Sequence, residues 1–500
     1  EKYTQWCLAR QCGGINTIRF TQMLSSIAHF FWGKIKTYMK ELRQIIWLTF
    51  FVISTINFSI AQEDRYIPLI HSNTETISCQ INGVKHGWNI MPNLKPDRLS
   101  VTCKEETTEV VFITDIDSIK FNIKPNQHYY FNILLNNRDS ALTEIVGIKY
   151  VKPASFNKKY ISEHKGKVFV EVPEVQELTH IIFAITDIGQ KDSNMIDMTT
   201  SYYKKVIQHF LPFKNHPIVM QFDTLLKQGY YTYLKMNSCA YIFKENEIVK
   251  GGIYDRLAWT DENNLEPFIK HLQDFAIKSD FRKFYKGNLP YYNSLIKEQK
   301  KKVPVEKMWE WLENEFPDKY DSYKITFSPL VYGCHSTNRF EDNGFSETVM
   351  FICGPNRGTF PDNYSDKVRE GFLARVVFTE IDHNYVNPLT DKYAKEVDKT
   401  FINKKQWVTE KAEKYYSTPY AIFNEYMTWG VFTLYIYDNF SKEDFEIINK
   451  KTEDMMSDGR GFYKYREFNK QLLDLYKARV DGQKVSDLYF KILEWCSNLK

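Results

Sequence analysis

The chain changes character once, near residue 152, and this change limits the folds it can adopt more than any other feature. Before it, from about residue 65, the apolar runs are short, rich in β-branched and aromatic residues, and separated by polar turn residues. This pattern is typical of strands, and the clearest examples are 109–113, 118–123 and 129–135. We therefore expect residues 62–155 to form a small antiparallel β domain, either a sandwich or a single sheet.

Beyond the change in pattern, apolar residues recur at three- and four-residue spacing, which predicts helices. The expected helices are 174–187, 200–211, 217–228, 265–285, 305–315, 366–387, 419–437, 442–456 and 465–496. Two short segments, 231–234 and 324–327, are expected to add strands. The predicted fold class is therefore α+β, in which residues 156–500 form a mostly helical second domain.

A short apolar run at residues 45–53 follows two basic residues and precedes Ser59-Ile60-Ala61. A positive region, a short apolar run and small residues at the third-last and last positions are the layout of a secretory signal peptide. A membrane span would need about 20 apolar residues. We expect residues 39–61 to be a signal peptide cleaved after Ala61, and residues 1–38 to be a leader outside the native protein. The expected location is periplasmic or extracellular, with no stable membrane span after cleavage.

The charge balance argues against one class of partner. The chain has 66 basic and 62 acidic residues. Residues 1–61 hold seven of the basic and two of the acidic residues, so the rest of the chain carries 59 and 60 and is close to neutral. A phosphate-binding surface needs an excess of basic residues. We therefore expect no nucleic-acid partner, and the sequence indicates no oligomeric state.

Six cysteines follow the predicted cleavage site, and an oxidising compartment permits disulfides. Two pairs bracket short segments and are the expected bridges, Cys79–Cys103 and Cys334–Cys353. The chain has no C-x-x-C, no phosphate-binding glycine loop and no G-x-S-x-G, so the corresponding zinc-ribbon, nucleotide and hydrolase sites lack their defining residues. Cys334 and His335 are adjacent, and adjacent side chains rarely face each other, so a cysteine nucleophile is not expected.

The most informative segment is 375–388. It lies in a helix that Ser365 is expected to cap and that should end near Pro388, because proline cannot continue a helix. Five residues recur at helical spacing on one face, which we expect to be the buried face. They are Phe372, Val376, Thr379, His383 and Val386.

Zinc peptidases build their site from H-E-x-x-H on a helix. The two histidines hold the metal from one face, and the glutamate activates the bound water. Here Glu380 and His383 have the required spacing, but Thr379 stands at the first ligand position. The motif is therefore incomplete.

At this point the chain resembles an uncharacterised family of exported bacterial proteins, chiefly from the Bacteroidota. Members of that family often carry H-E-x-x-H followed by a short polar and aromatic run that ends in Val-Asn-Pro. The resemblance covers roughly residues 160–440. It rests on the segments 379–388, 423–429 and 170–178.

The resemblance implies a gluzincin-like metallopeptidase domain, in which a glutamate on a downstream helix is the third zinc ligand. Matched position by position, it places Glu380 at the general base, His383 at the second ligand and Glu425 at the third. Thr379 departs from the family pattern.

The surroundings of Glu425 give an independent check. It lies in an apolar helix that begins near Pro419, where an unpaired carboxylate is costly, so it needs a cation or a hydrogen-bond donor. Considered without the resemblance, the expected partner is a tyrosine or a backbone group. Likewise, a single helical histidine such as His383 is more often a hydrogen-bonded core residue than a ligand.

Three residues are candidates for the missing ligand: Asp382, His335 and Thr379 itself. Asp382 lies about 100° around the helix axis from its neighbour His383. Threonine is a poor zinc ligand, whereas His335 is free to approach from a loop.

Two functions remain open. The chain is either a secreted zinc metallopeptidase that hydrolyses peptide bonds, with Glu380 as base and His383 and Glu425 as ligands, or a catalytically inactive secreted protein that binds a peptide or glycan on the same scaffold.

Overall fold

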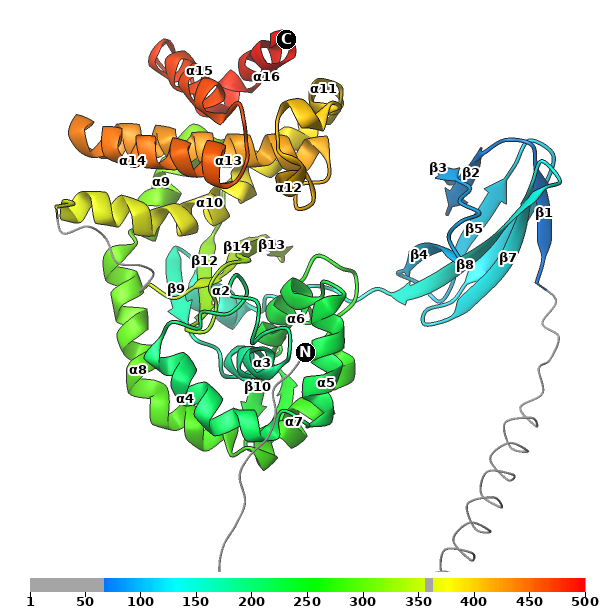
Figure 1. The fold of residues 1–500 in the computed structure, drawn as a ribbon, viewed down its shortest axis with the longest axis horizontal. Helices are drawn as coiled ribbons and strands as arrows, with labels where there is room; N and C mark the ends of the chain where they lie inside the picture. Colours follow the sequence, from blue (N-terminus) through cyan, green and yellow to red (C-terminus); the bar gives the residue numbers. More distant parts are fainter. Residues whose placement is uncertain (1–66, 356–362, 500) are drawn as a thin grey trace, which may run out of the picture.

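The structure is a computed structural model that describes residues 67–355 and 363–499. The predicted leader, 1–38, and the predicted signal peptide, 39–61, lie outside these residues, so both stay predictions. Among the helices of the described residues, none is both long and apolar enough to cross a membrane. The α+β class is confirmed: strands dominate the first part of the described chain and helices the second (Figure 1).

The first part consists of two four-stranded sheets, in the orders β1-β7-β8-β4 and β3-β2-β5-β6. Side chains from both sheets meet in one hydrophobic core, in which Val110, Phe112 and Phe131 are fully buried. The strands are β1 (Leu69–Ser72), β2 (Thr76–Ile81), β3 (Val84–Asn89), β4 (Asp97–Cys103), β5 (Thr108–Ile113), β6 (Ser118–Ile123), β7 (His128–Leu135) and β8 (Asp139–Lys149).

The antiparallel β domain is confirmed, and it also contains two parallel pairings that the sequence did not indicate. β1 pairs with β7, and β4 with β8, in parallel. Hairpins produce antiparallel neighbours, whereas parallel neighbours need a crossing connection. In this domain the chain crosses between the two sheets after β1 and again before β4. The direction of these two strands relative to their neighbours is therefore not determined by a hairpin.

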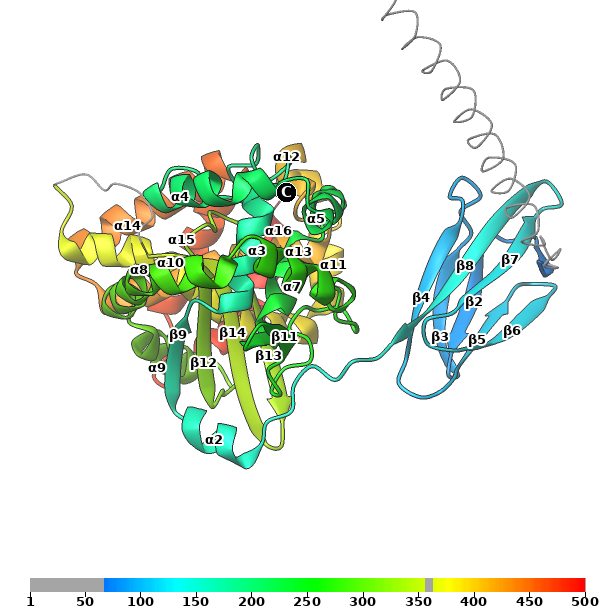
Figure 2. The ribbon, with the colours of Figure 1, turned by 90° about the horizontal axis from the view of Figure 1, so that it is seen from below.

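The second part is built around a mixed sheet in the order β13-β14-β12-β9. β9 (Lys167–Glu171), β12 (Ser322–Ser328) and β14 (Phe345–Cys353) are parallel, and β13 (Ser336–Asp342) is an antiparallel edge strand. Figure 1 shows this sheet between two groups of helices: α10 and α13 lie on one side, and α3 on the other. Figure 2 shows the β domain joined to this part by the segment that follows β8.

The helices of the second part surround the sheet, and a small hairpin lies beside it. The helices are α2 (Lys158–His164), α3 (Glu174–Ile185), α4 (Ser201–Phe210), α5 (Pro217–Lys227), α6 (Tyr231–Asn237), α7 (Ile269–Lys278), α8 (Phe281–Lys302), α9 (Val305–Glu315), α10 (Asp366–Lys392), α11 (Ala394–Phe401), α12 (Glu410–Glu413), α13 (Pro419–Asn439), α14 (Lys442–Asp454), α15 (Tyr465–Lys477) and α16 (Tyr489–Asn498). The hairpin consists of β10 (Tyr241–Lys244) and β11 (Glu247–Lys250).

Three local expectations were wrong. Residues 231–234 belong to helix α6 rather than to a strand, because Tyr231, Leu234 and Lys235 are buried at helical spacing and four residues were too few to show it. The expected helix 265–285 is interrupted near Asp280, which has a left-handed backbone (φ +51°). The expected helix 465–496 is interrupted where Gly482 has φ +80°.

The expected disulfides are not formed, and all six cysteines of the described residues are thiols. Cys79 lies on β2 and Cys103 on β4, which belong to opposite sheets. The Cys103 thiol donates toward the carbonyls of Val101 and Ile123, at 3.7 and 3.6 Å. Cys334 is exposed and accepts a hydrogen bond from Asn194, whereas Cys353 is buried at the end of β14.

Candidate functional site

The site is carried by α10, which begins where the sequence predicts but continues past Pro388. Ser365 caps the helix, since its hydroxyl accepts a hydrogen bond of 3.0 Å from the Val368 amide. Proline has no N–H to give to the carbonyl of Asn384, one turn earlier. That carbonyl instead accepts a hydrogen bond of 2.8 Å from the Tyr320 hydroxyl, and the helix extends to Lys392. A neighbouring side chain thus satisfies the backbone group that the proline would otherwise leave unpaired.

One face of α10 is only partly buried and forms a stripe along the helix. The stripe consists of Val376, Glu380, His383 and Asn387. Phe372, Thr379 and Val386 are buried as expected, whereas His383 and Val376 are only partly buried. The spacing of the apolar residues predicts which side of the helix is buried, but not where the edge of that side lies. His383 and Val376 lie at this edge, where a side chain can reach a ligand.

His383 and Glu425 meet, as the family resemblance implied. Thr418 caps α13, accepting a hydrogen bond of 3.1 Å from the Ala421 amide, and Glu425 follows two turns into that helix. The Nε2 atom of His383 lies 3.7 Å from Oε1 of Glu425, and its Nδ1 atom lies 3.2 Å from Oδ1 of Asn387. Both side chains are largely buried, with exposed fractions of 22% for His383 and 13% for Glu425.

Glu425 already has a cation, and that cation is Arg460. The Arg460 guanidinium donates a hydrogen bond of 2.8 Å to Oε2 of Glu425 and another to the Tyr416 hydroxyl. Its central carbon lies 5.3 Å from the centre of the Trp429 ring, so the cation is also held over an aromatic face. Trp429 adds a hydrogen bond of 3.3 Å from its indole nitrogen to the same carboxylate oxygen.

A π-helical turn delivers Arg460 to this position. The π-helical turn Met455–Gly459 follows α14, and the Arg460 amide closes it by donating to the Met455 carbonyl at 2.8 Å. Gly461 has φ +81°, and a Cβ atom there would lie 2.3 Å from the Thr409 hydroxyl, so only glycine fits. π-Helical turns of this kind are frequent at functional sites.

Glu380 is influenced electrostatically by these groups and by a second cation that the sequence did not indicate, Lys235. Burial raises the pKa of Glu380 to about 7, even though His383 and Lys235 act to lower it. Lys235 of α6 is fully buried and donates hydrogen bonds of 2.5 and 3.4 Å to the carbonyls of Cys334 and Phe351. Burial lowers the pKa of Lys235 to about 8, while the nearby Cys334 thiol and Glu380 act to raise it.

None of the three expected substitutes completes a zinc site. The Thr379 hydroxyl donates to the carbonyl of Arg375 at 2.9 Å, within its own helix. Asp382 is fully buried, burial raises its pKa well above the usual range, and neither carboxyl oxygen has a hydrogen-bond partner among the described residues. His335 stands just before β13, and no group of three His, Cys, Asp or Glu side chains in the described residues is placed to hold a metal.

The donor set therefore does not fit a catalytic zinc ion. Such an ion normally takes three protein ligands and keeps one open position. Here two of the implied ligands converge, the first is replaced by a threonine bonded to its own helix, and an arginine neutralises the third. Among the described residues, the site therefore lacks the three-ligand set with which a zinc ion activates a bound water.

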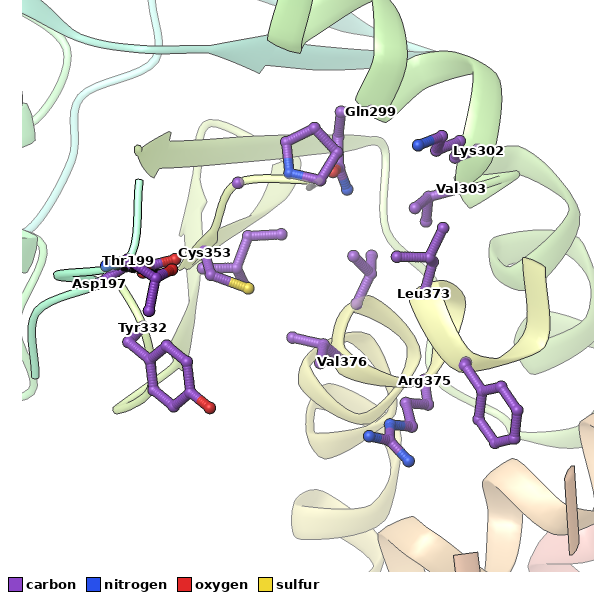
Figure 3. Close-up of a pocket in the computed structure, with 15 residues that line it drawn as sticks. Asp197, Thr199, Gln299, Lys302, Val303, Tyr332, Cys353, Leu373, Arg375 and Val376 are labelled. Atoms are coloured by element: carbon purple, nitrogen blue, oxygen red, sulfur yellow. Dashed lines mark hydrogen bonds between the residues drawn. The ribbon is translucent and has the colours of Figure 1, made fainter. Parts of the chain in front are cut away.

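A cavity of about 490 Å³ adjoins the partly buried stripe of α10 at Val376 (Figure 3). Its walls come from the first turns of α10, the end of β14, the last turn of α8 and the segments around Asp197 and Tyr332. Leu373, Val376 and Val303 supply an apolar wall, and Arg375 and Lys302 bring positive charge. The cavity is large enough for one bulky side chain of a ligand.

The edge strand β13 runs beside the same helix. The Asn384 side chain of α10 donates a hydrogen bond of 3.1 Å to the Thr337 hydroxyl of β13. β13 stands last in its sheet, so one side of it has no strand partner among the described residues. The Trp259 indole donates to the Thr337 carbonyl at 3.2 Å and shields that position of the edge.

Arg460 and Lys235 are the charged residues of the candidate site that sequence reasoning missed. The one sequence signal for Arg460 was its position between two glycines in Gly459-Arg460-Gly461, which marks a tight turn but not its direction. Lys235 gave no signal, because a lysine in a helix is usually exposed.

Comparison of the chain with protein-family models, with curated proteins and with solved structures yields no match. The resemblance to exported Bacteroidota proteins therefore stays a prediction.

Proposed function

We propose that this protein is a metal-free relative of the gluzincin-like peptidases that binds extended polypeptide and does not cleave it. The observation that carries the proposal is the hydrogen-bonded pair between Arg460 and Glu425. The charge of Glu425, which the resemblance assigns to zinc, is neutralised by a side chain of the chain itself. Thr379 supports the same conclusion, because its hydroxyl is bonded to the backbone of α10.

Two features favour a polypeptide over a glycan as the ligand. The open side of β13 offers backbone groups to which an extended chain can add as a further strand. The cavity beside Val376 lies at the same helix and accepts one bulky side chain. Main-chain hydrogen bonds along an edge and a pocket for a side chain are together a common mode of peptide recognition.

Metal analysis tests the first half of the proposal. Wild-type protein incubated with zinc and dialysed is expected to retain none, and Thr379→His alone is expected to bind zinc poorly, because Arg460 still holds Glu425. The double variant Thr379→His/Arg460→Met supplies three ligands and frees the carboxylate, so it is expected to bind about one zinc. Stoichiometric zinc in wild type that is lost in His383→Ala would overturn the proposal.

Binding of fluorescein-labelled casein, a polypeptide with little fixed structure, tests the second half. Wild type is expected to bind it by fluorescence anisotropy and to leave it intact on a denaturing gel. Val376→Arg, which places a charge in the apolar wall of the cavity, is expected to weaken binding about tenfold or more. Lys158→Glu, at the exposed start of α2, is the control and should leave binding unchanged. Cleavage of the casein, or equal binding by Val376→Arg, would contradict the proposal.

A further inference from the structure

The sheet of the second part has a second polar region, on the face opposite to α10. Successive side chains of a strand point to opposite faces. On β12, Tyr323 hydrogen-bonds Tyr385 of α10, so Lys324 and Thr326 of alternating register point to the other face. A cavity of about 330 Å³ lies there, bounded by these two residues, by Glu171 of β9, by strand β10 and by the segment around Tyr254.

Lys324 brings a positive charge into this cavity and is held in place by aromatic residues. Its ammonium donates a hydrogen bond of 3.0 Å to the Tyr160 hydroxyl and lies 5.4 and 5.2 Å from the ring centres of Tyr160 and Tyr254. An ammonium group has three donors. Among the described residues, Tyr160 is the one hydrogen-bond acceptor of Lys324, and no carboxylate lies within 4.0 Å of it. Burial acts to lower the pKa of Lys324, but Glu171 and Glu347 raise it above the usual value, so the group is charged.

Two carboxylates are near Lys324, and they differ in their partners. Glu347 accepts hydrogen bonds from the hydroxyls of Tyr160, Tyr254 and Ser322, so its oxygens are in use. Glu171 lines the cavity and makes no hydrogen bond or ion pair with its side chain in the described part of the chain. The register places Glu171 beside Thr326, one step along the same face from Lys324. The two opposite charges therefore face the cavity without touching.

Much of the rest of the wall is apolar and comes from Ile242, Phe243, Ile253, Leu257 and Val349. Glu174 also lines the cavity, but its carboxylate is paired with Arg282 at 2.7 Å. Its volume lies at the lower end of the range for small-molecule sites, about 300–1,000 Å³, which suits a ligand the size of a single amino acid. An anion alone would meet Glu171, and a cation alone would meet Lys324, so each would be repelled by one of the two charges.

We propose that this cavity binds a free α-amino acid with an apolar side chain, whose carboxylate pairs with Lys324 and whose ammonium pairs with Glu171. The apolar side chain lies against the aliphatic wall. This site is separate from the one on α10 and does not depend on the function proposed there.

Isothermal titration of the full mature chain with L-phenylalanine tests the proposal, with 2-phenylethylamine and 3-phenylpropionate as probes that each lack one charge. L-Phenylalanine is expected to bind saturably, and each analogue at least about tenfold more weakly. Glu171→Gln and Lys324→Met are each expected to weaken L-phenylalanine binding by about tenfold or more. Glu171→Gln keeps size and shape, so it remains informative if Lys324→Met fails to fold.

Lys450→Gln, at an exposed position of α14 away from both cavities, is the control and should bind L-phenylalanine as wild type does. Three results would overturn the proposal. They are no heat of binding at millimolar L-phenylalanine, an analogue that binds as tightly as the amino acid, or undiminished binding by Glu171→Gln.

Discussion

Replacing Arg460 with methionine removes the cation from Glu425 and keeps most of the volume of the arginine stem. Breaking a buried ion pair by deleting one partner costs about 3–5 kcal/mol, whereas exposed pairs contribute about 0.2–1 kcal/mol. The Arg460 side chain is 29% exposed and that of Glu425 is 13% exposed, so the pair lies between these limits. We expect Arg460→Met to lower the free energy of unfolding by about 2–3 kcal/mol.

Urea unfolding followed by the far-ultraviolet circular dichroism of the helices measures this loss, because the helices lie in the same part of the chain as the pair. Glu425→Gln is the matched partner, since it removes the charge and keeps the shape. If the two side chains are coupled, Glu425→Gln/Arg460→Met should be less destabilised than the sum of the single variants by about 1–2 kcal/mol. Additive losses, or a loss below about 0.5 kcal/mol for Arg460→Met, would refute the argument that Arg460 neutralises Glu425.

Four further predictions concern other parts of the chain. Burial raises the pKa of Glu177 to about 7. Between about pH 4.5 and 7 the folded state therefore keeps a proton that the unfolded state loses. The free energy of unfolding should fall as the pH rises through this range. Glu177→Gln should remove this decline and be more stable than wild type by up to about 3 kcal/mol at pH 8 but not at pH 4, as measured by urea midpoints. Asp382→Ala should stabilise the protein by about 1–2 kcal/mol at pH 7 in the same assay, because it removes a buried carboxyl that has no hydrogen-bond partner among the described residues. A thiol reagent should label Cys334 fastest in the native chain, since Cys79, Cys103, Cys353 and Cys496 are buried, and peptide mapping identifies the labelled residue. Mass spectrometry of protein from an exporting host should find Gln62 at the mature N-terminus, and earlier residues on the exported protein would contradict the predicted cleavage.

The sequence predicted that the two helices carrying the site exist, but it predicted less well where they end and which of their residues are exposed. The helix around His383 and the helix around Glu425 both exist, because long apolar periods and the caps Ser365 and Thr418 are local signals. The continuation of α10 past Pro388 was not predictable from local sequence. It depends on the Tyr320 hydroxyl, which arrives from a different segment to bond the Asn384 carbonyl.

The same distinction applies to individual residues. Motif spacing and family resemblance pointed to Glu380, His383 and Glu425, and the structure places His383 beside Glu425, while the roles assigned to them stay predictions. The Glu425 carboxylate was correctly expected to need a cation or a donor, but the identity of that partner depends on tertiary structure. Arg460 lies 35 residues further along the chain and reaches Glu425 through a π-helical turn, which has no sequence period of its own.

The pairing of Arg460 with Glu425 also bears on how a site of this kind can lose its metal. A largely buried glutamate that loses its metal keeps a negative charge in apolar surroundings, and leaving that charge unpaired is costly. A guanidinium supplies the missing positive charge together with fixed donors, and here three aromatic side chains, Trp429, Tyr416 and Phe462, hold it within 5.7 Å of their ring centres. With Arg460 in place, a zinc ion held by a histidine at position 379 would have to compete with Arg460 for the Glu425 carboxylate. A zinc site at this position would therefore need both substitutions, because Thr379→His alone leaves Glu425 paired with Arg460, and loss of Arg460 alone leaves Glu425 without a cation.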